Sequence, residues 1–130
     1  MSKNTINDDK AESSDNKSSV PIDIRKGLME FDNNVEFFKS LIEEFIEHIG
    51  KKISVMEKAV IDNNNDILRR EAHAIKGGAA NVSAEELSKT ACELEQVCKT
   101  GTEAEIASSV DQIKNEFFSL KEYVQNHDSL

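Results

Sequence analysis

The chain is poor in the residues that form turns, sheets and disulfide frameworks. Its 130 residues include one proline, five glycines, one tyrosine and no tryptophan. So few turn residues leave little material for the many short connections of an all-β domain, and the composition therefore favours helices. The length is enough for one domain with a single core.

The cysteines are too few and too badly spaced for a cross-link or a zinc site. Cys92 and Cys98 are the two cysteines of the chain, and both fall on a predicted helix. At about 1.5 Å rise per residue their backbones would be about 9 Å apart, which is beyond disulfide reach. Their spacing also lacks the close cysteine pair of a zinc site. We expect both thiols to be reduced, Cys98 to lie in the core, and no metal to be bound.

Long apolar runs and an excess of positive charge are both missing. No run approaches the roughly 20 apolar residues that span a bilayer, and no basic start precedes an apolar segment. We therefore expect a cytoplasmic protein without membrane insertion. The formal net charge is -9 at pH 7, which argues against binding nucleic acid, because that affinity depends on Lys and Arg at the phosphates.

The chain divides into a polar start and an amphipathic remainder. Apart from Met1, residues 1–19 contain a single sizeable apolar residue, Ile6. Such a segment cannot bury enough surface to offset the entropy of ordering it, so we predict a disordered tail or linker. Residues 20–130 carry apolar residues at helical spacing and form the predicted domain.

Helical periodicity predicts an all-α fold, an antiparallel up-down four-helix bundle with a short additional N-terminal helix. Asp23 is the expected N-cap of the short helix, and the four long helices end near residues 61, 82, 100 and 124. Ser83 with Glu86, and Thr102 with Glu105, have the spacing of capping boxes, which predicts that a helix starts at each. Most phenylalanines are expected in the core: Phe31, Phe37, Phe38 and Phe45.

The third long helix carries a histidine on its polar face. On a helical wheel its apolar residues gather on the side opposite His73 and form the expected core stripe: Leu68, Ala72, Ile75, Ala79 and Val82. His73 should therefore point to solvent. An exposed imidazole is largely neutral at pH 7, so one ring nitrogen is a competent nucleophile without a general base.

The neighbours of this histidine run against the acidic composition of the chain. Arg69, Lys76, Gly77 and Ala80 share its side of the helix, and Arg70 lies at the edge. Residues 66–82 contain three basic and two acidic side chains, a local balance of +1. These cations could stabilise an anion placed on the imidazole.

Two adjacent glycines interrupt this helix one turn after the histidine. Each interior glycine costs roughly 0.8–1.0 kcal/mol relative to alanine, so Gly77 and Gly78 need a reason. A bulky side chain at Gly77 would overhang His73 and block the approach of another protein. Gly78 is turned toward a neighbouring helix, where close packing explains it.

The stretch from His73 to Ala84, HAIKGGAANVSA, resembles the signature of the histidine phosphotransfer (HPt) family of phosphorelays, H-x-[IL]-K-G-[GS]-[AS]. An alanine before the histidine, and Leu87 and the Leu94-Glu95 pair after it, extend the likeness to roughly residues 22–125. Ser83 departs from it, because the family usually has glycine there; we expect a local change in the turn and no loss of function.

The resemblance implies a phosphoryl carrier without turnover of its own. By that match His73 is phosphorylated, Lys76 is the cation on the phosphate side, and Gly77 provides clearance. Arg69, Arg70 and Ala80 join Gly77 as candidate docking residues. The implied partner is a receiver domain of a response regulator or hybrid kinase, which would hold Mg²⁺ itself; this chain is expected to bind no cofactor and to be a monomer.

Three other functions compete with this one. The phosphotransfer domain of chemotaxis-type histidine kinases has a very similar motif and would take its phosphoryl group from a kinase domain. A helical adaptor would bind a signalling partner without being phosphorylated, although the intact His73 and Lys76 count against it. A di-iron bundle needs Glu-x-x-His pairs on two facing helices, and the sequence has none.

Overall fold

Five helices account for most of the residues that the computed structural model describes, which are 20–127 and 130. They are α1 (Ile24–Glu30), α2 (Val35–Ile61), α3 (Asn65–Asn81), α4 (Glu85–Thr100) and α5 (Glu103–Gln125). No strand occurs in this part of the chain, which confirms the prediction of an all-helical fold. The predicted tail, residues 1–19, lies outside the described residues.

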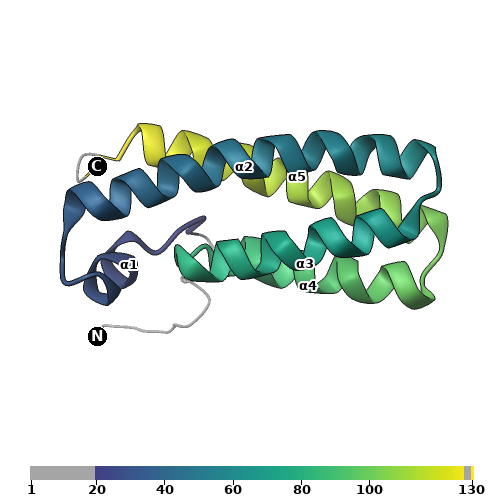
Figure 1. Cartoon of the computed structure of the whole chain (residues 1–130), viewed down its shortest axis with the longest axis horizontal. Helices are drawn as coiled ribbons and strands as arrows, with labels where there is room; N and C mark the ends of the chain where they lie inside the picture. Colours follow the sequence, from purple (N-terminus) through teal and green to yellow (C-terminus); the bar gives the residue numbers. More distant parts are fainter. Residues whose placement is uncertain (1–19, 128–129) are drawn as a thin grey trace, which may run out of the picture.

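Each of the four long helices lies beside two others (Figure 1). Helix α3 packs on α2 and α4, and α5 packs on α4 and α2. Phe45 of α2 lies against Gly78 of α3, and Lys52 of α2 pairs with Glu71 of α3 at 3.1 Å. The two contacts show that α2 and α3 run in opposite directions. The short α1 contacts the start of α2.

One apolar core runs between the long helices. The predicted stripe of α3 is confirmed, because all of its members are buried: Leu68, Ala72, Ile75, Ala79 and Val82. Cys98 is buried as expected, and both cysteines are free thiols. Burial of this stripe fixes the rotation of α3 about its axis, which turns the opposite face to solvent.

The phenylalanines of α2 divide between core and surface. Phe38 and Phe45 are buried as predicted, but Phe37 is 50% exposed, so its assignment to the core was wrong. Phe37 follows Val35 at the first turn of α2, where α1 covers only part of the helix, and its ring meets that of Phe31 with centroids 5.3 Å apart. Phe31 is itself half-buried.

The turn between α3 and α4 corrects the predicted role of Ser83. The N–H of Ala84 donates to the carbonyl of Ala79 (2.8 Å) and the N–H of Ser83 to that of Ala80 (3.2 Å). This is the Schellman pattern of a helix C-terminus, with Ser83 at the left-handed position that glycine usually occupies. Its φ is 64° and its side chain is buried.

The predicted capping box at Ser83 was therefore wrong. Helix α4 takes Ala84 as its N-cap, without a side-chain hydrogen bond, because Ser83 already ends α3. The turn has the Schellman form despite the serine, because Ser83 adopts the left-handed conformation that glycine favours. The two other predicted caps are confirmed, since Asp23 caps α1 and Thr102 forms a capping box with Glu105.

The segment before α1 is fastened to this same turn. Ile22 is fully buried, and the N–H of Asp23 donates to the carbonyl of Ser83 at 2.9 Å. Lys26 of α1 forms an ion pair with Glu85 at the start of α4. The beginning of the described chain thus covers the end of the bundle where α3 turns into α4.

Length and hydropathy separate these helices from membrane spans. Among the described residues no helix is both long and apolar enough to cross a bilayer.

Candidate functional site

His73 projects from the middle of α3 with 69% of its side chain exposed, as predicted. The helix begins at the N-cap Asn64, whose side chain accepts a hydrogen bond from the N–H of Ile67. The core stripe on the other side leaves the imidazole no apolar surface to pack on. The ring is therefore accessible to another molecule from the solvent side.

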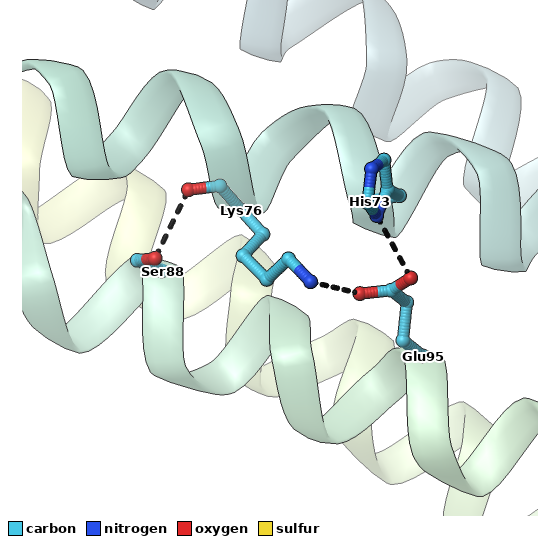
Figure 2. A network of polar contacts seen from close by, with 4 residues as sticks. All are labelled: His73, Lys76, Ser88 and Glu95. Atoms are coloured by element: carbon cyan, nitrogen blue, oxygen red, sulfur yellow. Dashed lines mark hydrogen bonds and ion pairs between the residues drawn. The ribbon is translucent and has the colours of Figure 1, made fainter.

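A carboxylate from the neighbouring helix holds one nitrogen of this ring. The His73 Nδ1 lies 3.0 Å from the Glu95 Oε2, and Glu95 belongs to α4 (Figure 2). The other oxygen of the same carboxylate, Oε1, lies 2.8 Å from the Lys76 Nζ. Glu95 thus bridges the histidine and the lysine, and only 14% of its side chain is exposed.

The charges of this bridge support each other. The hydrogen bond from Lys76 lowers the pKa of Glu95 below its ordinary value, against the effect of burial and with help from His73. The same bond with Glu95 raises the pKa of Lys76. At neutral pH the pair is therefore a carboxylate and an ammonium ion.

An ionised carboxylate can only accept hydrogen bonds, and this determines the tautomer of His73. The proton of the neutral ring must be on Nδ1, where it is donated to the Glu95 Oε2 at 3.0 Å. The lone pair is then on Nε2, at the free edge of the ring. The site combines an oriented, exposed imidazole with a partly buried acceptor behind it.

Ser88 of α4 also connects α4 to α3, at a position nearer the start of α4 than Glu95. Its Oγ donates to the backbone carbonyl of Lys76 at 3.0 Å (Figure 2). Together, Ser88 and Glu95 link α4 to both ends of the segment from His73 to Lys76. The α3–α4 contact is the most extensive one between helices in the described chain.

Two of the three predicted basic neighbours, Arg69 and Arg70, lie on the N-terminal side of His73 in α3. An open depression beside His73 is lined by Asp66, Arg69, Arg70, His73 and Glu95. Arg69 reaches Asp66 at 3.8 Å, and 91% of the Asp66 side chain is exposed, so this ion pair is weak. Arg70 is exposed and has no ion-pair partner among the described residues.

The two glycines differ as predicted. A Cβ atom at Gly77 would meet nothing within 4 Å, so the surface beside His73 is open there. A Cβ atom at Gly78 would lie 3.3 Å from the ring of Phe45, which confirms its role in packing α3 against α2. Ala80 is exposed on the open side, as expected for the predicted docking face.

Glu95 is the residue of this site that the sequence did not reveal as a contact of His73. The two residues are 22 positions apart and on different helices, so no periodicity within one helix relates them. The signal was available only as the Leu94-Glu95 pair of the family resemblance.

The described residues offer no alternative metal chemistry. No group of three or more His, Cys, Asp and Glu side chains among them is arranged to hold a metal ion.

Comparison with known proteins decides the family. A family model described as "Hpt domain" matches residues 40–126. The chain belongs to the Hpt domain family. Histidine phosphotransfer in phosphorelays is therefore its function.

The Hpt fold is also found in a solved structure. The crystal structure of histidine-containing phosphotransfer protein B (HptB) from Pseudomonas aeruginosa PAO1 matches with a TM-score of 0.70. At 22% sequence identity, the match covers 82% of this chain and 96% of that one. A search of curated proteins gave no match.

Proposed function

We propose that His73 accepts a phosphoryl group at Nε2 and exchanges it with the aspartate of a receiver domain. The observation that carries this proposal is the hydrogen bond from Nδ1 to Glu95, which leaves Nε2 unprotonated and exposed. Among the three histidines of the chain, His73 is the one inside the family motif. The chain would act as a carrier, with no turnover of its own.

The transfer step needs little from this chain beyond orientation. Nε2 attacks the phosphorus of an aspartyl phosphate, the N–P bond forms, and the electron pair of the broken P–O bond stays on the aspartate. The ring keeps its proton on Nδ1, and the negative charge of Glu95 balances the positive charge that the ring acquires. Activation of the donor is mostly positioning and charge neutralisation, which the receiver and its Mg²⁺ would supply.

Lys76 would stabilise the phosphoryl group through Glu95. A bare carboxylate behind the imidazole would repel an incoming phosphoryl group. Lys76 removes that repulsion, because its ammonium lies 2.8 Å from the carboxylate. Without this cation the carboxylate would still balance the positive charge of the ring, but it would repel the negatively charged phosphoryl group.

The docking face would consist of the open side of α3. Gly77 and Ala80 leave room for the receiver surface, and Arg69 and Arg70 would meet the acidic residues around its aspartate. We further propose an antiparallel up-down arrangement of the four long helices, which would keep this face rigid. The carrier would work as a monomer in the cytoplasm, without a bound cofactor and without nucleic acid.

Incubation with a phosphorylated receiver and Mg²⁺ tests the proposal. Label should appear on the wild-type chain and disappear in His73→Gln, which should fold normally because the side chain is exposed. His48→Gln is the matched control, since His48 is exposed on α2 and should not affect labelling. Label that persists in His73→Gln would exclude His73, and no label in any variant would favour a non-phosphorylated adaptor.

A further inference from the structure

We infer that the phosphoryl group on His73 sits in the open depression on the N-terminal side of α3 and takes its cationic contacts from Arg69 and Arg70. This inference rests on the proposed phosphorylation of His73 and assigns the phosphoryl-binding cations within that function. Lys76 keeps the role proposed above, that of neutralising Glu95.

The direction of the imidazole is the first reason. Nδ1 points at the Glu95 carboxylate, and the Lys76 ammonium lies on the far oxygen of that carboxylate (Figure 2). The two nitrogens of an imidazole project from different edges of the ring. A group bonded to Nε2 is therefore directed away from the Glu95 carboxylate.

The second reason is that Lys76 is already engaged. Its ammonium is bound to Glu95 at 2.8 Å, and only 34% of the side chain is exposed. To reach a phosphoryl group it would have to leave a partly buried carboxylate, which would then lose its only cation in the described chain and keep just the hydrogen bond from His73. Such an exchange is unfavourable while other cations are free.

The third reason is that two arginines beside the ring are available. Arg69 and Arg70 lie four and three residues before His73, the separations at which helical side chains meet. Both line the depression with His73, whereas Lys76 does not. Arg70 has no ion-pair partner in the described chain, and Arg69 would give up only the exposed Asp66 at 3.8 Å.

The chemistry of the guanidinium group suits this task. Guanidinium groups bind phosphoryl oxygens through paired N–H donors, and they stay charged at every physiological pH. The depression also holds two carboxylates, Asp66 and Glu95. The charge of Glu95 is compensated by Lys76, and Asp66 is almost fully exposed and free to turn away.

Small phosphoryl donors separate this role from protein docking. Phosphoramidate should label His73 in the wild type, and the rate and the lifetime of the phosphohistidine should be measured without any receiver. Arg69→Gln and Arg70→Gln should each reduce one or both by roughly two- to fivefold, the size expected for an exposed ion pair. The double variant should show a larger loss.

Arg25→Gln is the matched control, because Arg25 is the remaining arginine of the chain and lies on α1. It should behave as the wild type. Lys76→Gln should instead change the Nδ1/Nε2 tautomer ratio of His73, read from its ¹⁵N chemical shifts. The arginine variants should leave that ratio unchanged.

Two results would overturn the inference. If the arginine variants react with phosphoramidate and lose the phosphoryl group at wild-type rates, while transfer from the receiver falls, the arginines act only in docking. If Lys76→Gln alone shortens the phosphohistidine lifetime, Lys76 is the cation in contact. Failure of the proposed function is a separate outcome, namely that no donor labels His73 in the wild type.

Discussion

At the scale of single residues, the contact that matters most is the one between His73 and Glu95. The exposed face of α3 could be predicted from the wheel because it depends only on which residues must be buried. The partner of the histidine could not, because it depends on how far α4 is shifted along α3. That shift is set by packing between helices, for which the sequence of one helix carries no pattern.

The Glu95 carboxylate should govern the reactivity of His73. Glu95→Gln keeps the shape of the side chain but removes the charge that holds both the Nδ1 proton and Lys76. We expect a more even tautomer ratio in the ¹⁵N spectrum and phosphorylation by phosphoramidate slower by about fivefold. Glu93→Gln, at an exposed position of the same helix, should change neither. Equal rates in the two variants would leave Glu95 without a chemical role.

Ser83 should be a point of weakness in the fold. It holds a left-handed conformation, and its buried hydroxyl has no hydrogen-bond partner among the described residues. Ser83→Gly should raise the free energy of unfolding by about 1 kcal/mol, because the left-handed conformation costs an L-residue roughly 1–2 kcal/mol. Ser83→Ala removes the hydroxyl and keeps the backbone cost, so its gain should be smaller. Urea unfolding measures both, and an alanine variant as stable as the glycine variant would contradict the backbone argument.

At the scale of elements, the helix starts and stops show where local reasoning succeeds. Thr102 with Glu105 and Asp23 were correctly predicted, because each cap is completed within four residues. Ser83 failed because two helices compete for the same residue. Ser83 has a side chain suited to be the N-cap of α4. The Schellman hydrogen bonds that end α3 instead place it in the left-handed conformation, where it does not cap α4.

The pair Gly77 and Gly78 should separate access from packing on one helix. Gly77→Gln should retain the stability of the wild type and lose most receiver-dependent phosphorylation, while phosphoramidate still reacts. Gly78→Gln should lower the free energy of unfolding by roughly 1–3 kcal/mol, because its side chain must displace Phe45, only 3.3 Å from the added Cβ. Thermal melts and both labelling assays should be run on each variant. Gly77→Gln that accepts phosphate from its receiver normally would show that the receiver approaches elsewhere.

At the scale of the whole molecule, two carboxyl groups couple stability to pH in opposite directions. The pKa of Glu95 is lowered, so its contribution is present at neutral pH and lost as pH falls through its folded-state pKa. The pKa of Glu116 is raised, mainly by burial and despite hydrogen bonds from Thr90 and Gln112. Its contribution is present below the ordinary glutamate pKa and lost as pH rises through the folded-state value.

Glu116→Gln should therefore stabilise the protein at neutral pH. Glutamine resembles the protonated acid and removes a buried carboxylate whose Oε1 has no hydrogen-bond partner in the part of the chain that the structure describes. The gain in melting temperature should be largest near pH 7 and should shrink toward pH 4. Glu122→Gln, at an exposed position of the same helix, serves as the control. A gain that stays constant over this range would mean that Glu116 is stabilised as well when charged as when neutral.

The buried Ile22 has a consequence for how this domain is delimited. The family model matches from residue 40, but the buried residues of the described chain begin earlier, at Ile22. Residues 20–23 are held, through Ile22 and the bond from Asp23 to Ser83, against the turn that directly follows α3. A force applied to residues 20–23 would therefore act first on the end of α3, the helix that carries His73.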